Sequence, residues 1–162
     1  MIPIRDLFET HLTVGDLPRA MAFYGDVLGL EIARLFPERK IAFYWIGERG
    51  NSMLGLWEAQ ARSKPQNLHI AFRVSTADML KAYESLRAAG VVPLDFERNP
   101  TTEPVVLAWM PAASLYFNDP DGNLLEFLSM LPEAPEPALG IVSWSDWKRR
   151  RTRDGQDEGR AK

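Results

Sequence analysis

The sequence predicts an α+β protein built from two βαβββ modules, and three observations lead to this class. Apolar residues alternate with polar ones in several short runs, as they do in half-buried strands. Two longer segments instead place apolar residues at helical spacing. The same order of strand and helix patterns occurs twice along the chain of 162 residues. Because neither copy can cover its sheet alone, we expect the two modules to pair around a common core.

The first module, residues 7–58, opens with the alternating run LFETHLTV. Asp16 then precedes Leu17 and Pro18, which is the N-cap and first-turn pattern of a helix, and Gly29 closes that helix. Three strand-like runs follow, with the sequences LEIARLF, RKIAFYWIG and NSMLGLWE. The predicted order is therefore βαβββ.

The second module, residues 68–130, follows the polar linker AQARSKPQN and repeats this order. Its first strand is LHIAFRV, Ser75 and Asp78 form a capping-box pattern, and Gly90 ends the helix. The later strands are predicted at VVPLDFE, AASLYFN and NLLEFLS. Residues 98–109 form an insertion whose apolar character suits a cover for the site or an extension of the sheet, and simple packing is the preferred interpretation.

We expect a single domain over residues 1–131 and a C-terminal tail over residues 132–162. The tail begins with the Pro-rich stretch PEAPEPALG, which suits neither a helix nor a central strand. The apolar stretch IVSWSDW is predicted to fold back onto the domain. The final stretch, KRRRTRDGQDEGRAK, is polar throughout and is predicted to be disordered.

Composition excludes several classes of function. The 22 acidic and 19 basic residues are spread along most of the chain and give a net charge of −3, which does not favour nucleic acid as a partner. The chain has no Cys, so thiolate ligands, thiol nucleophiles and disulfides are excluded. There is no signal-peptide pattern and no apolar run of about eighteen residues, so we expect a soluble, cytoplasmic protein without a membrane partner.

Three side chains are candidate metal ligands. His11 and His69 are the two histidines of the chain, and each lies on the first strand of its module. Glu126 lies among apolar neighbours on a late strand, where a carboxylate needs a reason to point inward. Leu56 is taken as the counterpart of Glu126 in the first module. His69 and Glu126 are 57 residues apart, and His11 and Leu56 are 45 residues apart. The difference, 57 minus 45, equals the 12 residues of the insertion.

Two imidazoles and one carboxylate suit a divalent transition metal with open positions for water or substrate. The residues alone leave an alternative open, in which both histidines are hydrogen-bonded strand residues and Glu126 faces solvent.

Three strings, HLTVGDLPRAMAFYGDVLGLEI, LHIAFRV and YFNDPDGNLLEF, resemble the vicinal oxygen chelate superfamily. This superfamily includes glyoxalase I, fosfomycin-resistance thiol transferases, methylmalonyl-CoA epimerase, extradiol dioxygenases and bleomycin-resistance proteins. The likeness covers residues 7–130. It implies a glyoxalase-like, cup-shaped mixed sheet with metal ligands at His11, His69 and Glu126. The implied cofactor is one divalent ion per site, Zn, Mn, Ni, Fe or Co, which stabilises negative charge on neighbouring substrate oxygens.

The resemblance also implies a class of activity. We expect a metal-dependent enzyme, either a lyase or isomerase of the glyoxalase type or a thiol transferase, with Glu126 as a catalytic residue. The expected partners are a small oxygen-bearing substrate, a thiol co-substrate in the transferase case, and a second copy of the chain. In such a homodimer His11 of one copy would join His69 and Glu126 of the other.

Resemblance to particular branches of the superfamily indicates further candidates for substrate contact. Thr13, Ser114 and Tyr116 look similar to the hydroxyl groups of the fosfomycin branch, and Trp109 is an additional candidate for substrate contact. Glyoxalase I usually has a fourth carboxylate ligand on the last strand of its first module. Here that position is predicted to be apolar, with Glu58 as a solvent-facing strand end. A bleomycin-type protein that sequesters a drug in an aromatic groove and an extradiol-type dioxygenase are the alternatives.

Overall fold

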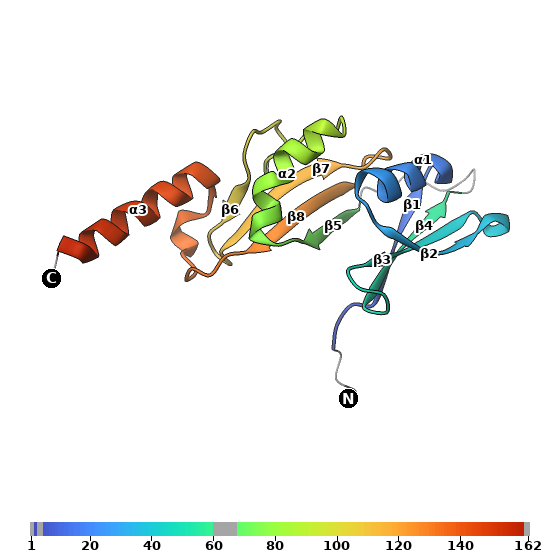
Figure 1. Ribbon diagram of the computed structural model, residues 1–162, viewed down its shortest axis with the longest axis horizontal. Coiled ribbons are helices and arrows are strands. Elements are labelled where there is room, and N and C mark those ends of the chain that lie inside the picture. Colours follow the sequence, from blue (N-terminus) through green and yellow to red (C-terminus); the bar gives the residue numbers. More distant parts are fainter. Residues whose placement is uncertain (1, 3–4, 60–67, 161–162) are drawn as a thin grey trace. The chain divides into compact units, whose positions relative to one another are not determined.

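The computed structural model describes residues 2, 5–59 and 68–160, and it divides into two compact units. Unit 1 comprises Met1–Leu68 together with Asp119–Asn123, and unit 2 comprises His69–Asn118 together with Leu124–Lys162. Each unit combines a mixed β-sheet with helices (Figure 1). The predicted α+β class is therefore confirmed. Most of the linker AQARSKPQN lies outside the described residues.

Unit 1 contains a four-stranded sheet in the order β1-β4-β3-β2. Its strands are β1 (Glu9–Val14), β2 (Glu31–Phe36), β3 (Ile41–Ile46) and β4 (Ser52–Glu58). β1 pairs in parallel with β4, and β3 pairs antiparallel with both of its neighbours. The 3-10 helix η2 (Pro37–Arg39) joins β2 to β3.

The predicted first helix is present, but its second half is a π-helix. It consists of α1 (Leu17–Met21) and η1 (Ala22–Val27). The side chain of Asp16 accepts a hydrogen bond from the backbone N–H of Arg19 at 2.8 Å, as expected of an N-cap. This segment packs on one face of the sheet, where alternate residues of β1 and β4 are fully buried, namely Leu12, Val14, Leu54 and Leu56. The residues between them, including His11 and Gly55, therefore lie on the opposite face.

Unit 2 contains a five-stranded sheet in the order β5-β8-β7-β6-β9. Its strands are β5 (His69–Arg73), β6 (Val105–Leu107), β7 (Ala112–Asn118), β8 (Leu124–Met130) and β9 (Ile141–Ser143). β5 pairs in parallel with β8, and the other neighbouring pairs are antiparallel.

The helix α2 (Thr76–Ala88) covers one face of the unit 2 sheet by packing on β7 and β8 (Figure 1). The predicted cap is confirmed, because the hydroxyl of Ser75 accepts from the N–H of Asp78 at 3.1 Å and donates to its carboxylate at 2.6 Å. The buried residues Met79, Ala82 and Leu86 form the apolar face of the helix. The opposite face of the sheet is left for His69, Glu126 and their neighbours.

One predicted strand of unit 2 is wrong. The stretch VVPLDFE forms only isolated bridges, from Leu94 to Pro100 and to Tyr116. Pro93 has no N–H to donate to a ladder, so a strand through it is disfavoured. The missing strand is β6, which comes from the insertion at 98–109 and pairs with both β7 and β9. The insertion therefore extends the sheet.

The segment after residue 131 is more ordered than predicted. The expected return of IVSWSDW onto the body is confirmed, since β9 pairs with β6 and Trp147 is 1% exposed. The 3-10 helix η3 (Pro137–Leu139) precedes β9, and α3 (Trp144–Arg160) follows it, so much of the stretch predicted to be disordered is helical. Arg151 lies over the Trp147 ring at 4.1 Å and pairs with Glu136, which fixes the start of this helix.

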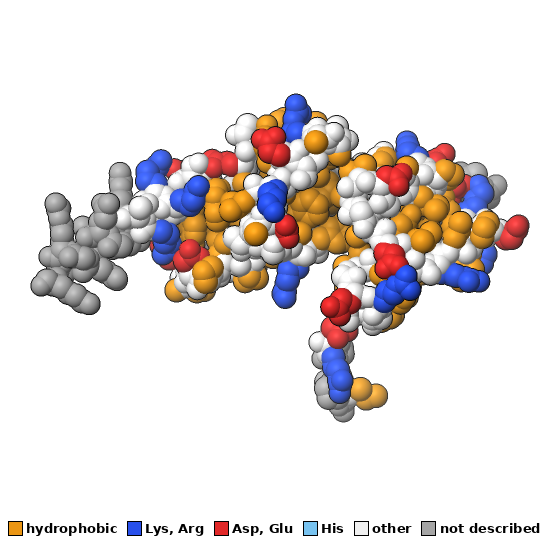
Figure 2. All heavy atoms as spheres, in the orientation of Figure 1, with side chains coloured by type: hydrophobic (Ala, Val, Ile, Leu, Met, Phe, Trp, Pro, Cys, Tyr) orange, Lys and Arg blue, Asp and Glu red, His pale blue; other side chains and the backbone are white. Residues whose placement is uncertain are grey.

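Charged side chains of both signs are interspersed with apolar ones on the face drawn in Figure 2. Among the helices of the described residues, none combines the length and the apolar character that a membrane span requires.

Candidate functional site

Unit 2 brings together His69 and Glu126, two of the three predicted ligands. In the parallel pair of β5 and β8, Ala71 lies opposite Glu126, and His69 lies two residues earlier on the same face. The Nε2 atom of His69 is 3.0 Å from Oε2 of Glu126. Glu126 is only 3% exposed, and its other oxygen, Oε1, is buried without a hydrogen-bond partner among the described residues. The carboxylate therefore points inward.

Tyr116 lies beside this pair. It is opposite Glu126 in the antiparallel pair of β7 and β8, and its ring centroid is 6.1 Å from that of His69. Burial, together with the negative charge of Glu126, raises the pKa of the Tyr116 phenol to about 12. At neutral pH the phenol is therefore protonated and is able to donate a hydrogen bond.

Of the other predicted substrate contacts in unit 2, Ser114 joins this face and Trp109 does not. Ser114 lies two residues before Tyr116 on β7, is fully buried, and has no partner for its Oγ among the described residues. Trp109 is 56% exposed and lies in the β6–β7 turn, beyond the last pair of the hairpin, Leu107 and Ala112. The face of the sheet thus carries two hydroxyl groups, one imidazole and one carboxylate.

Unit 1 carries a second imidazole and carboxylate pair, on β1. The Nε2 atom of His11 contacts Oε1 of Glu9, two residues earlier on the same face of the strand. The ring of His11 lies 5.0 Å from that of Trp57 and 5.9 Å from that of Phe43, measured between centroids. Thr13, the remaining predicted substrate contact, follows on this face and is half-buried. Sequence reasoning had not assigned Glu9 to the site.

The strand starts align the two units differently from the predicted equivalence of the two histidines. Glu9 and His69 are the first residues of β1 and β5, where they pair with Met53 and Leu124. Each also lies five residues before a valine, Val14 at the end of β1 and Val74 directly after β5, since 14 minus 9 and 74 minus 69 are both 5. Glu9 is therefore the counterpart of His69, whereas His11 corresponds to Ala71. On this alignment by strand position, the two histidines lie two residues apart.

The predicted counterpart of Glu126 is also corrected. His11 pairs with Gly55 in unit 1 and Ala71 pairs with Glu126 in unit 2, so Gly55 occupies the place of Glu126. Leu56, the predicted counterpart, is fully buried on the opposite face. A Cβ atom on Gly55 would lie 2.6 Å from Cδ2 of His11, which is closer than van der Waals contact allows. The His11 ring therefore lies directly over the bare backbone of Gly55.

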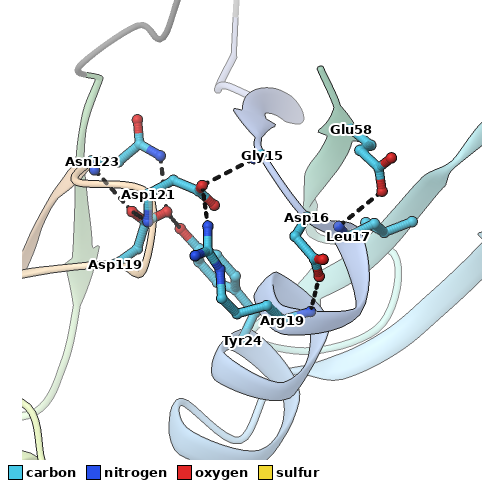
Figure 3. Close-up of polar contacts among 9 residues, drawn as sticks. All are labelled: Gly15, Asp16, Leu17, Arg19, Tyr24, Glu58, Asp119, Asp121 and Asn123. Carbon is cyan, nitrogen blue, oxygen red and sulfur yellow. Dashed lines mark hydrogen bonds and ion pairs between the residues drawn. The ribbon is translucent and has the colours of Figure 1, made fainter. Parts of the chain in front are cut away.

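Glu58 is not the free strand end that the sequence predicted. Its carboxylate pairs with Lys40 and accepts the backbone N–H of Leu17, at the start of α1, at 3.0 Å (Figure 3). The hydrogen bond from Lys40, followed by that from Leu17, lowers the pKa of Glu58. Glu58 therefore joins β4 to the first helix.

The turn Asp119–Asn123, between β7 and β8, is bound to α1 and η1 within unit 1 (Figure 3). The Asp119 carboxylate accepts the N–H of Asn123 at 2.8 Å and the phenol of Tyr24 at 2.9 Å. Asp121 accepts from the N–H of Gly15 at 3.0 Å and from Arg19 at 2.6 Å. Burial, together with the charge of Asp119, raises the pKa of Tyr24.

The donors of unit 2 fit a divalent transition metal. A buried carboxylate with one unpartnered oxygen, next to an imidazole, supplies the oxygen and nitrogen ligands that such ions accept. Within one chain, the described residues contain no group of three or more His, Asp or Glu side chains placed to hold a metal ion. Each unit supplies a pair.

The family model of the glyoxalase/bleomycin resistance protein/dioxygenase superfamily matches residues 7–127. The chain belongs to this superfamily. The vicinal oxygen chelate resemblance is thereby confirmed.

Two curated relatives are enzymes. A metallothiol transferase, FosB, of Lysinibacillus sphaericus is 30% identical over 71% of this chain and 75% of its own. A lactoylglutathione lyase of Arabidopsis thaliana is 29% identical over 80% of this chain. The match spans only 45% of that plant protein.

Solved structures share the glyoxalase-like fold. An integron cassette protein from the mobile metagenome of the Halifax Harbour sewage outfall has a TM-score of 0.68 and 33% identity, covering 78% of this chain and 100% of its own. The lactoylglutathione lyase of Agrobacterium tumefaciens has a TM-score of 0.61 and 25% identity, covering 79% of this chain and 96% of its own. The predicted fold class is therefore confirmed at this level.

Proposed function

We propose that this protein is a divalent-metal-dependent enzyme of the glyoxalase type, acting as a lyase or a thiol transferase on a small oxygen-bearing substrate. The observation that carries the proposal is the Glu126 carboxylate, which is buried next to His69 with one oxygen free of any partner among the described residues. Burial of a carboxylate oxygen without a partner is costly, and a bound cation would offset that cost. A metal ion is the partner that this donor set fits.

The proposed ligands are His69 and Glu126 of unit 2 and His11 of unit 1. The donor types accept Zn, Mn, Ni, Fe or Co, and the chain does not select among them. When bound, the ion would supply Lewis-acid chemistry, which stabilises negative charge on neighbouring substrate oxygens. Support for His11 comes from its place on the open face of the unit 1 sheet, where its Nε2 atom contacts Glu9.

The chain's own groups orient the substrate. Burial and the charge of Glu126 raise the pKa of the Tyr116 phenol to about 12, so this protonated group would donate a hydrogen bond to an anionic substrate oxygen. Ser114, buried on the same face with an unpartnered Oγ in the described structure, offers a second hydroxyl. His69 contacts Oε2 of Glu126, which leaves Oε1 for the proposed ion. Thr13 offers a hydroxyl on the open face of unit 1.

Turnover assays with different substrates distinguish a lyase from a thiol transferase. We would purify the protein without added metal, determine its metal content, and load it in turn with Ni, Mn, Zn and Fe. Turnover would be measured with methylglyoxal and glutathione, with fosfomycin and thiols, and with catechols. Metal-dependent turnover with either thiol-containing mixture supports the proposal. Turnover with catechols alone would replace it with a dioxygenase.

A sequestering protein of the bleomycin type is the second candidate, and the aromatic wall of unit 1 favours it. On the open face of that sheet, the ring centroids of Phe43 and Trp57 each lie within 6 Å of that of His11. Such a surface stacks on flat ligands. Tight binding of bleomycin that persists after chelation, without turnover in any assay, would support this candidate and contradict the enzymatic one.

We further propose that the protein acts as a homodimer in which His11 of one copy serves the His69 and Glu126 of the other. Mixing His11→Ala chains with Glu126→Ala chains tests this arrangement. If ligands come from different copies, random pairing restores about a quarter of the sites, since half of the dimers are mixed and each regains one site. If all ligands come from one copy, mixing restores none.

A further inference from the structure

We infer that a pocket in unit 2, outside the pair His69 and Glu126, binds a protonated amine carried on an apolar body. The pocket lies between residues 95–105 and the strand β9, and its volume is 290 Å³. This volume is close to the lower end of the range for small-molecule sites, about 300–1,000 Å³. As the place of one arm of the substrate, the pocket rests on the proposed function. As a binding site for an organic cation, it does not.

The pocket is built from parts of the chain that have no counterpart in unit 1. The strand β6 comes from the insertion, and β9 lies beyond residue 127, where the family match ends. The unit 1 sheet has four strands, whereas the unit 2 sheet has five because β9 pairs with β6. The pocket is therefore a feature of this chain and not of the repeated βαβββ scaffold.

Apolar side chains form part of the lining. Val105 comes from β6, Ile141 comes from β9, and Phe96 comes from the loop before the insertion. Phe96 is 48% exposed and Ile141 is 40% exposed, so both present apolar surface to a ligand. An aliphatic and aromatic surface of this kind takes the carbon skeleton of a ligand, and an aromatic ring also attracts a cation.

Three carboxylates complete the charged part of the lining, namely those of Asp95, Glu97 and Glu103. Asp95 accepts the backbone N–H of Asn99 at 2.9 Å, and Glu103 accepts that of Ser145 at 2.9 Å. Both donors are neutral. Among the described residues, no basic side chain lines the pocket or forms an ion pair with any of the three carboxylates. The pocket therefore carries negative charge that favours a cation.

The distribution of this charge favours an organic cation over a metal ion. A hard ion such as Ca²⁺ takes about six to eight oxygen ligands. The part of the chain that the structure describes contains no group of three or more His, Asp or Glu side chains placed to hold a metal ion. The three carboxylates instead share the lining with apolar residues. An ammonium group on a carbon skeleton matches this combination of separated charges and apolar surface.

The pocket adjoins the sheet face that carries Tyr116. The ring of Phe96 meets that of Tyr116 edge to face, with 6.2 Å between the centroids. Val105 pairs with Ser114, so the side chains of these two residues lie on the same face. A substrate that accepts a hydrogen bond from Tyr116 would therefore extend past Phe96 into the pocket. The structure thus assigns to the proposed substrate a second, amine-bearing end.

Binding of three probes that differ in charge tests this inference without any assay of turnover. The probes are 2-phenylethylamine, 2-phenylethanol and phenylacetate, titrated into ¹⁵N-labelled protein and followed by NMR. We expect the amine to shift the backbone signals of Phe96, Val105 and Ser143 and to bind about 10-fold more tightly than the alcohol, since each exposed ion pair changes affinity by up to about fivefold. Equal binding of the three probes, or unchanged signals at these residues, would overturn the inference.

Substitutions in the lining separate the effect of charge from that of shape. The double variant Glu97→Gln, Glu103→Gln should lose the preference for the amine, about 10-fold, and bind the alcohol as wild type does. Phe96→Ala should weaken both probes alike. Glu84→Gln, which changes an exposed carboxylate on α2, is the control and should leave both affinities unchanged. Circular dichroism would establish that each variant is folded. A double variant that keeps the preference would contradict the assignment.

Dopamine and catechol distinguish the role of the pocket from the proposed function. Both have neighbouring oxygens, but only dopamine has an amine. With Zn²⁺-loaded protein, we expect dopamine to bind about 10-fold more tightly than catechol, and the double variant to abolish this difference. Equal affinities would overturn the role of the pocket as a place for the substrate. A protein that binds no Zn²⁺ but still prefers 2-phenylethylamine would overturn the proposed function and support the amine site.

Discussion

The two units carry the same pair of ligand types at different depths. In unit 2 the side chain of Glu126 is buried, whereas that of His69, on the edge strand β5, is about half exposed. In unit 1 both Glu9 and His11 are partly exposed, and the buried residue opposite His11 on β4 is Gly55. Two copies of one βαβββ scaffold thus carry the same donor types on different strands. Counterparts must therefore be identified by strand register.

The largest effect should follow from removing the buried carboxylate. In Glu126→Ala, we expect metal affinity to fall by more than about 100-fold, because loss of a ligand should exceed the 10- to 100-fold cost of losing a hydrogen-bond partner of a ligand. Calorimetric titration with Zn²⁺ would measure it. Glu84→Ala, which changes an exposed carboxylate on α2, is the control. Equal affinities in the two variants would contradict the assignment of Glu126.

Each unit also has a buried phenol beside a carboxylate, Tyr24 with Asp119 and Tyr116 with Glu126. Asp119→Ala should destabilise the protein by about 2–3 kcal/mol, because it leaves the Tyr24 phenol and turn N–H groups without their acceptor. Asp121→Ala should cost less than about 1 kcal/mol, since its partner Arg19 is largely exposed. Urea unfolding would measure both. A larger loss in Asp121→Ala would contradict this ranking.

Gly55→Ala should have an intermediate effect on metal affinity, about 10-fold, since its Cβ displaces the His11 ring without removing it. Gly25→Ala is the matched control, because a Cβ there makes only ordinary contacts of 3.8 Å with Tyr44. Zinc titrations of both variants provide the test. An unchanged affinity in Gly55→Ala would show that the position of His11 over Gly55 has no bearing on binding.

The smallest effect concerns pH. Because the pKa of Tyr116 is raised in the folded state from 10.0 to about 12, its protonated form contributes stability that is fully present below pH 10. That contribution is lost as the pH rises from 10 through about 12. In Tyr116→Phe the stability should therefore fall less steeply over this window, as measured by urea unfolding at pH 8 and pH 11. An identical pH dependence in wild type and variant would contradict the assignment.

Much of the fold could be predicted from local patterns. Alternation located β1 to β5, β7 and β8, and the caps at Asp16 and Ser75 located both helices, because these signals depend on neighbouring residues alone. The strand β6 was missed because three residues in an insertion give too short an alternation to identify. The helix α3 was missed because its charged stretch has few apolar residues, whereas its start depends on burial of Trp147 in unit 2.

The candidate site was predictable in part. Glu126 was identified because a carboxylate in an apolar strand is costly unless it is paired, and the structure places it next to His69. Glu9 was missed because an acidic residue near the start of a strand looks like an ordinary surface group. The available signal was its distance of five residues to Val14, which equals the distance from His69 to Val74. The sequence by itself does not show whether this distance or the residue type aligns the two modules, and the position of Glu9 at the start of the β1–β4 pairing favours the distance.

The most direct test of the central claim is a Zn²⁺ titration followed by NMR of the imidazole nitrogens. The chain has only two histidines, so each ring gives its own signals, and a His11→Thr sample assigns them. The account predicts that both imidazoles shift together and saturate at one Zn²⁺ per chain. A shift of His69 alone, with His11 unchanged at saturation, would contradict the proposal that His11 is a metal ligand.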